Sequence, residues 1–385
     1  MSVTAAQGFT AAGIAAGIKD NGNPDLALVV NNGPRLAAAG VFTSNRVKAA
    51  PVLWSEQVLR GGAVSAVVLN SGGANACTGP RGFQDTHATA EKVAEALGGE
   101  HNAGEVAVAS TGLIGVLLPM DKLLPGVDTA VAALSEDGGE AAAIAIKTTD
   151  TVHKTATASQ DGWTVGGMAK GAGMLAPGLA TMLVVLTTDA DLDSATLDKA
   201  LRSATRTTFD RVDSDGCMST NDTVLLLASG ASGLVPSYEA FAEAVRTVCE
   251  DLARQLIGDA EGSTKDIRIE VIGAATEQDA VEVGRSIARN NLLKCAIHGE
   301  DPNWGRVLSA IGTTRAAFDP DRLNVAINGV WVCKNGAVGE DRDLVSMKDR
   351  EVRITADLAS GTESAVIWAN DLTAEYVHEN SAYAS

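Results

Sequence analysis

The segment that most constrains the fold of this chain is residues 169–190, AKGAGMLAPGLATMLVVLTTDA. Its first half is rich in glycine and contains a proline, which is typical of a loop. Its second half begins with TMLVVL, an apolar run with the length of a buried strand. Thr181 therefore stands at the first position of a predicted core strand, directly after Ala180 at the end of a permissive loop.

The rest of the chain mixes hairpins with long helices. Short apolar runs closed by Asn or Gly predict strands within 25–33, 37–45, 63–79 and 105–115. Helical spacing predicts helices over 83–99, over 191–209 with Ser194 as the N-cap, and over 237–258 between Ser237 and Gly258. Later strands are predicted at 266–274, 350–358 and 364–371, with a hairpin turn at Asn328-Gly329. This order favours an α/β fold of layered α+β type over a doubly wound sheet.

Composition limits the kinds of partner and site. The net charge of −18 argues against nucleic acid and against anionic membrane surfaces, which attract basic patches. The five cysteines are scattered without CxxC pairs or metal-ligand spacing, so we expect reduced thiols, no metal and a cytoplasmic location. The first residues lack a basic region followed by a long apolar one, and no run of 18 apolar residues occurs, so neither a signal peptide nor a membrane span is expected.

Thr181 is the first candidate for catalysis. A hydroxyl becomes a useful nucleophile when a base lies beside it, and an N-terminal threonine carries its own α-amine as that base. Such an amine titrates at about 7.7–8.0, close to working pH. An internal threonine lacks the amine, so the Ala180–Thr181 bond must first be cut by attack of the hydroxyl on the preceding carbonyl. A lone threonine at the start of a strand otherwise has a purely structural reading.

The run ASTGLIG supplies a second candidate. A strand that ends at Ser110, Thr111 and Gly112 can present a hydroxyl and a backbone N–H together, as an oxyanion hole requires. Lys170 heads the glycine-rich loop, and Glu261 lies between small residues in a loop where a carboxylate could receive a cation. Each of these residues also has an ordinary structural reading, as a turn, a solvated lysine and a loop carboxylate.

Three further patterns have weaker chemical readings. The KGAG run resembles a phosphate-binding loop but lacks the GxxxxGK[ST] spacing, which argues against a nucleotide cofactor. Residues 212–223 resemble a calcium loop without its closing Glu, so we interpret them as a turn that orders the core. His298 is a candidate catalytic base by residue type alone, and a single histidine without an identified partner is more often structural.

Together these stretches resemble one family, the ornithine acetyltransferases (glutamate N-acetyltransferases) of arginine biosynthesis. The matching segments run from residue 8 to residue 385: GFTAAGIAAGIK, GVFTSNRVKAAPV, LNSGGANACTG, ASTGLIG, KTTDT, AKGAGMLAPGLATML, DSDGCMSTNDT, EGSTK, HGEDPNWGR and ENSAYAS. The resemblance implies an αββα sandwich like that of self-cleaving N-terminal nucleophile (Ntn) hydrolases, with a smaller C-terminal α/β portion.

The resemblance also implies roles for particular residues. Self-cleavage between Ala180 and Thr181 would give an α chain of residues 1–180 and a β chain of residues 181–385, with Thr181 as the nucleophile. The oxyanion hole falls on Thr111 and Gly112. The substrate-binding positions fall on Thr148 or Thr149, Lys170, Thr181, Glu261, Asn380 and Ser385. The choice between the two adjacent threonines stays open.

The reaction implied is a two-step exchange without a cofactor. N2-acetylornithine acetylates Thr181 and leaves as ornithine, and glutamate then takes the acetyl group. Lys170 would hold the α-carboxylate of either substrate, and Glu261 the ornithine cation. Whether acetyl-CoA is a second donor stays open, and the family implies an α2β2 heterotetramer. The alternative hypothesis is that the chain is a self-cleaving amidase or aminopeptidase. A third hypothesis is a non-enzymatic scaffold.

Overall fold

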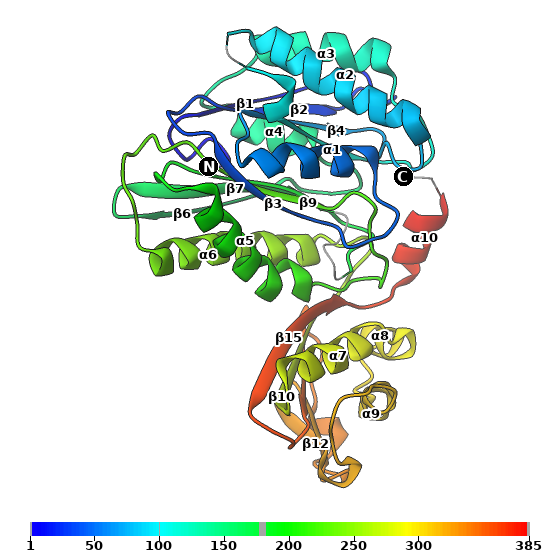
Figure 1. The fold of residues 1–385 in the computed structure, drawn as a ribbon. Coiled ribbons are helices and arrows are strands. Elements are labelled where there is room, and N and C mark those ends of the chain that lie inside the picture. Colours follow the sequence, from blue (N-terminus) through cyan, green and yellow to red (C-terminus); the bar gives the residue numbers. More distant parts are fainter. Residues whose placement is uncertain (1, 100, 177–181, 383–385) are drawn as a thin grey trace.

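The computed structural model describes residues 2–99, 101–176 and 182–382. Figure 1 shows a larger layered body with a smaller unit beneath it, and the C-terminal helix α10 (Ala374–Ala382) returns from the smaller unit to the side of the larger one. Ala180, Thr181 and Ser385, three of the predicted site residues, lie outside the described residues.

Two sheets form the centre of the layered body. The first has the order β1-β2-β4-β5: β1 (Phe9–Ile14), β2 (Leu26–Asn31), β4 (Ala66–Ser71) and β5 (Val106–Thr111). The second has the order β3-β9-β8-β7-β6: β3 (Ala37–Phe42), β9 (Thr223–Ala228), β8 (Leu183–Thr188), β7 (Trp163–Lys170) and β6 (Lys154–Gln160). In the first sheet only β4 and β5 run parallel, and in the second only β8 and β9.

Helices cover the outer faces of both sheets, as Figure 1 shows. Helices α2 (Gly79–Leu97) and α3 (Met120–Ala132) pack on the first sheet, and α5 (Ser194–Thr207) and α6 (Tyr238–Gly258) pack on the second. Two shorter helices, α1 (Ala50–Val58) and α4 (Gly139–Ala145), contact β5 and β1 respectively. The predicted αββα arrangement is therefore confirmed.

The core between the sheets is built from small and medium side chains. Val29, Val67 and Leu69 of the first sheet face Met168 and Val185 of the second in one buried cluster. The central strands are apolar on both faces because each sheet has the other sheet on one side and helices on the other. This explains why TMLVVL is a continuous apolar run rather than an alternating one.

The helix ends test the predicted caps. The Ser237 hydroxyl accepts the N–H of Ala240 at 3.2 Å and caps α6, as predicted. The predicted cap Ser194 is wrong, because it is the first residue of α5 and the Asp193 carboxylate accepts the N–H of Thr196 instead. The two residues are neighbours and both are good caps, so the pattern alone could not separate them.

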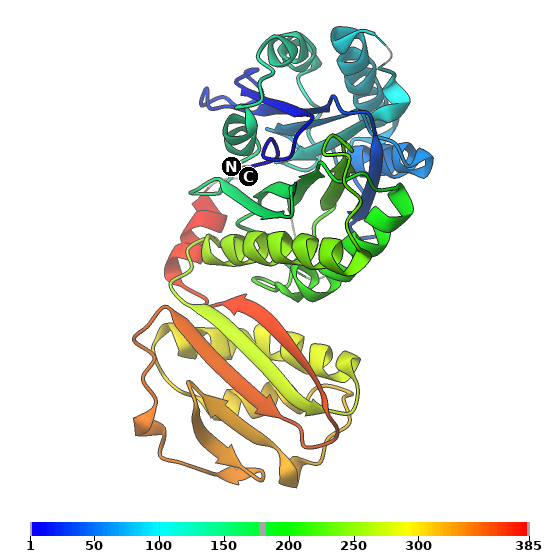
Figure 2. The same cartoon turned by 90° about the vertical axis from the view of Figure 1, so that its left-hand side faces the viewer.

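The smaller unit contains a separate sheet of six strands, which is seen face-on in Figure 2. Its order is β13-β12-β11-β14-β10-β15: β10 (Asp266–Ala274), β11 (Asn324–Ile327), β12 (Val330–Lys334), β13 (Ala337–Val338), β14 (Glu351–Asp357) and β15 (Glu363–Asn370). Helices α7 (Glu277–Ala288), α8 (Asn291–His298) and α9 (Trp304–Ile311) supply its apolar core with the sheet. The predicted Asn328-Gly329 turn joins β11 to β12, with φ values of 47° and 86°.

The second sheet of the layered body combines strands from both sides of the undescribed segment 177–181. Strands β6 and β7 precede it, and β8 and β9 follow it. The segments 1–180 and 181–385 therefore contribute to one sheet, and their separation into two chains stays a prediction.

Candidate active site

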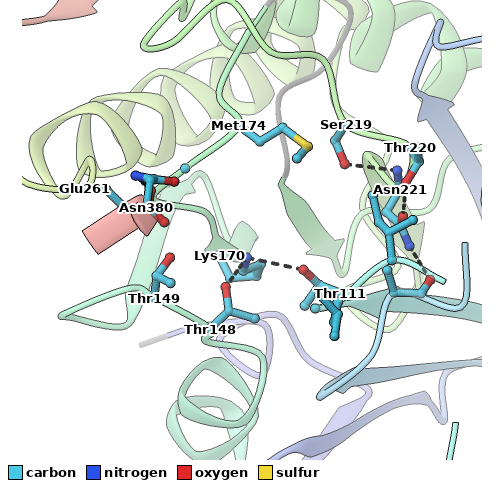
Figure 3. Close-up of a pocket in the computed structure, with 15 residues that line it drawn as sticks. Thr111, Thr148, Thr149, Lys170, Met174, Ser219, Thr220, Asn221, Glu261 and Asn380 are labelled. Carbon is cyan, nitrogen blue, oxygen red and sulfur yellow. Dashed lines mark hydrogen bonds between the residues drawn. The ribbon is translucent and has the colours of Figure 1, made fainter. Parts of the chain in front are cut away.

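Seven of the predicted site residues line one cavity of about 250 Å³ (Figure 3). They are Thr111, Gly112, Thr148, Thr149, Lys170, Glu261 and Asn380. The other lining residues are Ala74, Leu113, Ile114, Gly173, Met174, Ser219, Thr220 and Asn221. The cavity thus joins the ends of β5 and β7, the loop before β9, the loop after α6, and α10.

The turn after β5 is shaped by glycine. The N–H groups of Gly72 and Gly73 both donate to the carbonyl oxygen of Thr111 at 3.0 Å, so a second loop braces the turn. Gly112 has a φ of +130°, and a Cβ atom there would lie 2.7 Å from the Gly73 nitrogen. Both the backbone conformation and the close approach require glycine.

Lys170 ends β7 and points into the cavity from a buried position. Its Nζ lies 2.7 Å from the Thr148 Oγ1 and 3.4 Å from the Thr111 Oγ1, and its side chain is 2% exposed. A protonated lysine can only donate hydrogen bonds. Both threonine hydroxyls therefore accept from Lys170, and each keeps its own hydrogen for another acceptor, such as an oxygen atom in the cavity.

Asp150 holds this arrangement from the core side. Its Oδ1 accepts from the Lys154 Nζ and from the Gly171 N–H, each at 2.6 Å, and its Oδ2 accepts the Thr148 N–H at 3.0 Å and lies 3.9 Å from the Lys170 Nζ. Burial would raise the pKa of this carboxyl, but Lys170 and Lys154 outweigh burial and lower it to about 2. Burial lowers the pKa of Lys170, and the ionised Asp150 opposes that effect.

A carboxylate lies on another side of the cavity. The Asn380 Nδ2 on α10 donates to the Glu261 Oε2 at 2.9 Å, and the Glu261 N–H donates to the carbonyl of Ala172 at 3.0 Å. A Cβ atom on Gly173 would come within 2.5 Å of the Glu261 carboxylate oxygens, so a glycine lets the carboxylate approach. The cavity thus offers a buried cation and a carboxylate to a ligand with both charges.

The family of this chain follows from a match to a family model over nearly its whole length. The model of the ArgJ family matches residues 10–385. The chain belongs to the ArgJ family. This confirms the resemblance, which rested on ten matching segments.

The curated ArgJ relatives extend over the full length of the chain. The arginine biosynthesis bifunctional protein ArgJ of Streptomyces avermitilis is 85% identical over 385 residues, covering 100% of both chains. The protein of the same name from Thermobifida fusca is 63% identical, again over 100% of both chains. Sequence similarity of this extent leaves no part of the chain outside the family.

Two solved structures of ArgJ relatives match parts of the chain. Ornithine acetyltransferase of Mycobacterium tuberculosis, complexed with ornithine, is 63% identical over 47% of this chain and 96% of its own, with a TM-score of 0.45. The arginine biosynthesis bifunctional protein ArgJ of Bacillus halodurans is 35% identical over 52% of this chain and 98% of its own, with a TM-score of 0.49.

The sequence patterns did not indicate two parts of this candidate site. Asp150 follows the two predicted threonines directly, and its position in KTTDT is the only local signal of its role. Asn221 and Asp222 belong to the segment 212–223, whose pattern alone predicts only a turn that orders the core. The Asn221 side chain spans two backbone carbonyls near the cavity, and Asp222 is completely buried beside the start of β8.

Two other candidates lie elsewhere. His298 is in the smaller unit, where its Nδ1 lies 2.9 Å from the Asp371 Oδ2, and it does not line the cavity. The Ser110 hydroxyl donates to the Asn70 Oδ1 at 2.5 Å and is buried.

Among the residues with described positions, no group of three or more His, Cys, Asp or Glu could hold a metal ion. No helix in the described ranges is long and apolar enough to cross a membrane.

Proposed function

We propose that this chain is an acyltransferase of arginine biosynthesis that moves the acetyl group from N2-acetyl-L-ornithine to L-glutamate. The observation that carries the proposal is the single cavity in which Lys170, the Thr111–Gly112 turn and Glu261 come together. The names of the full-length relatives, arginine biosynthesis bifunctional protein ArgJ, agree with it.

The charges of the cavity match the two substrates. Both carry an α-carboxylate, which Lys170 and the Thr148 hydroxyl can bind together, since an ammonium–carboxylate contact and a hydroxyl donor reinforce one another. Glu261 suits the side-chain ammonium of ornithine, and the Asn380 Nδ2, which donates to the Glu261 Oε2 and to the Tyr376 carbonyl, holds that carboxylate in place. Of the two adjacent threonines, Thr148 is the one that shares Lys170, so we assign the carboxylate contact to it.

The chemistry proceeds through an acetyl ester of Thr181. Its hydroxyl oxygen attacks the acetyl carbonyl while its own α-amine takes the hydroxyl proton. The oxygen of the tetrahedral intermediate is stabilised by the Gly112 N–H and the Thr111 hydroxyl, whose hydrogen Lys170 leaves available. The amide C–N bond breaks, the proton passes to the departing nitrogen, and ornithine leaves. The α-amine of glutamate then attacks the ester, the C–O bond breaks, and the proton returns to Thr181.

The same proposal includes maturation and assembly. Cleavage between Ala180 and Thr181 gives chains 1–180 and 181–385, and the shared second sheet would hold them together. We propose that two such pairs form an α2β2 heterotetramer in the cytoplasm, and that Ser385 contributes a hydroxyl to the substrate site. The word bifunctional in the relatives' names supports acetyl-CoA as a second donor.

The test uses Thr181→Ala with Thr129→Ala as the control, because Thr129 is an exposed threonine on α3 outside the cavity. Intact mass should show two fragments for the wild type and for Thr129→Ala, and one uncleaved chain for Thr181→Ala. Acetyl transfer from N2-acetylornithine to glutamate, and separately from acetyl-CoA to glutamate, should be absent only in Thr181→Ala. A cleaved or active Thr181→Ala protein would disprove the nucleophile assignment. Release of free acetate without acetylglutamate would show an amidase instead.

A further inference from the structure

The proposed reaction needs two groups that belong to different sheets. The proposed oxyanion hole, Thr111 and Gly112, lies at the end of β5 in the first sheet, and residue 181 precedes Met182 and β8 of the second sheet in the sequence. We propose that Asn221 and Asp222 are positioning residues that fix the distance between these two groups. This inference rests on the proposed function and adds two residues that hold its parts together.

Asn221 holds the backbone around the proposed oxyanion hole. Its Nδ2 donates to the carbonyl of Ala74 at 2.6 Å and to the carbonyl of Ser110 at 2.8 Å, and its Oδ1 accepts the Thr220 hydroxyl at 2.5 Å. Both hydrogens of the amide are therefore engaged inside the protein, and the side chain is buried. Although Asn221 lines the cavity, its amide has no free donor for a substrate.

The two carbonyls that Asn221 holds belong to the two sides of the turn. Ser110 directly precedes Thr111, and Ala74 follows the loop whose N–H groups brace Thr111. The Ala74 N–H in turn donates to the carbonyl of Leu113 at 3.1 Å. Loss of the Asn221 amide would leave both carbonyls without this donor and would loosen the turn from two directions.

Asp222 holds the backbone of Met182, the residue that follows the proposed nucleophile in the sequence. Its Oδ1 accepts the N–H of Met182 at 3.1 Å, and this nitrogen is the peptide nitrogen that joins residue 181 to the strand. The carbonyl of Met182 accepts the N–H of Thr223 at 3.1 Å, so both backbone groups of Met182 are held. Asp222 is itself fixed, because its carbonyl accepts the N–H of Thr43 at 3.0 Å.

Asn221 and Asp222 are adjacent in the chain, so the contacts of their two side chains are joined by a single peptide bond. The Asn221 carbonyl accepts the Thr223 hydroxyl at 2.9 Å and the Asn221 N–H donates to the Ser219 hydroxyl at 3.0 Å, so the backbone between the two side chains is also held. Figure 3 places Asn221 across the cavity from Glu261 and Asn380, beside Thr111. A displacement of about 1 Å between reacting groups can reduce a rate by roughly 100-fold.

The first test compares Asn221→Ala with Asn31→Ala. Asn31 is a matched control, because its buried Nδ2 also donates to two backbone carbonyls, those of Arg35 and Ala228, but at the far end of β9. We expect both variants to have a lower melting temperature than the wild type. Only Asn221→Ala should slow self-cleavage on a denaturing gel and lower kcat by about 100-fold, with KM changed by less than about threefold. Equal kcat values in the two variants would overturn the proposal.

The second test separates positioning from proton transfer. Asp222→Asn keeps an oxygen that accepts the Met182 N–H, so we expect kcat within about threefold of the wild type and an unchanged pH profile. Asp222→Ala removes the acceptor and should lower kcat by at least tenfold. Loss of activity in Asp222→Asn would overturn the positioning role, since it would mean that the carboxyl itself is needed.

Folding and the proposed function are controlled separately. If Asn221→Ala is recovered unfolded, Asn221→Ser provides the comparison, because its hydroxyl can donate to one carbonyl. Its kcat should then fall below that of Asn31→Ala, and an equal kcat overturns the proposal. Cleavage of Thr181→Ala would refute the proposed nucleophile whatever the Asn221 variants do. An inert Thr181→Ala together with fully active Asn221 variants would refute only the positioning role.

Discussion

Replacing Asp150 by Asn tests the claim that a buried charge network holds Lys170 in place. The change keeps the shape of the side chain but removes the negative charge that lies between Lys154 and Lys170. The pKa of Asp150 is lowered from 3.8 to about 2, which corresponds to roughly 2–3 kcal/mol of folding free energy. Because the folded pKa is below the unfolded one, this contribution is complete at pH 7 and disappears as the pH falls through about 2.

The amide adds a second cost. Asp150 accepts four contacts, and an Asn must turn an NH₂ group toward one of the donors that now face the carboxylate. Leaving one buried donor unpaired costs about 1–3 kcal/mol, so the two contributions together are roughly 3–6 kcal/mol. At about 2 °C per kcal/mol for a body of this size, the melting temperature should fall by about 6–12 °C.

The assay combines melting with the pH dependence of kcat/KM. Without the charge 3.9 Å from its Nζ, Lys170 should have a still lower pKa, which moves the alkaline limb of kcat/KM to lower pH. Asp189→Asn is the matched control, because this buried carboxylate accepts the backbone N–H groups of Gln7 and Thr164 and no lysine contacts it among the described residues. It should lower the melting temperature without moving the limb. An Asp150→Asn protein that melts within about 2 °C of the wild type, with an unmoved limb, would refute the reasoning.

Two further predictions concern groups at the cavity. Gly112→Ala forces a Cβ to 2.7 Å from the Gly73 nitrogen, so kcat should fall by at least about 100-fold, whereas Gly115→Ala, also at positive φ but in open space, should retain kcat. Steady-state kinetics on both variants would check this, and equal activities would contradict the assigned turn. Lys170→Met removes the donor to Thr148, so KM for both carboxylate substrates should rise roughly 10–100-fold, and an unchanged KM would exclude Lys170 from carboxylate binding.

Much of the fold could be predicted because its signals are local. The Asn328-Gly329 turn needs two residues with positive φ, and the dipeptide alone indicates this. The helix from Ser237 to Gly258 has both a cap and an apolar face within one stretch of sequence. The choice of cap at Asp193 failed because two suitable neighbours compete for one position.

Residues of the candidate cavity could be predicted where a side chain carries its own chemistry or where a family motif marks the position, as for Gly112 and Asn380. Lys170 and Glu261 are ionisable, so composition and family pattern could single them out. Asn221 acts through the carbonyls of Ala74 and Ser110, which are 147 and 111 residues away in the chain. Asp150 lies only four residues before Lys154, but Lys170 meets it only after β6 and β7 have paired. Such contacts depend on tertiary structure and have no local pattern.

The charges around Lys170 explain why a lysine can be buried in a core of small apolar side chains. Lys154 is completely buried between Asp150, at 2.6 Å, and Asp259, at 2.5 Å. Two carboxylates around one lysine leave an excess negative charge, and Lys170 compensates it through Asp150. An isolated buried ammonium would destabilise the fold, whereas neighbouring opposite charges offset the cost of burying each ammonium. Sensitivity to mutation should therefore extend from the cavity to Lys154 and Asp259, neither of which lines it.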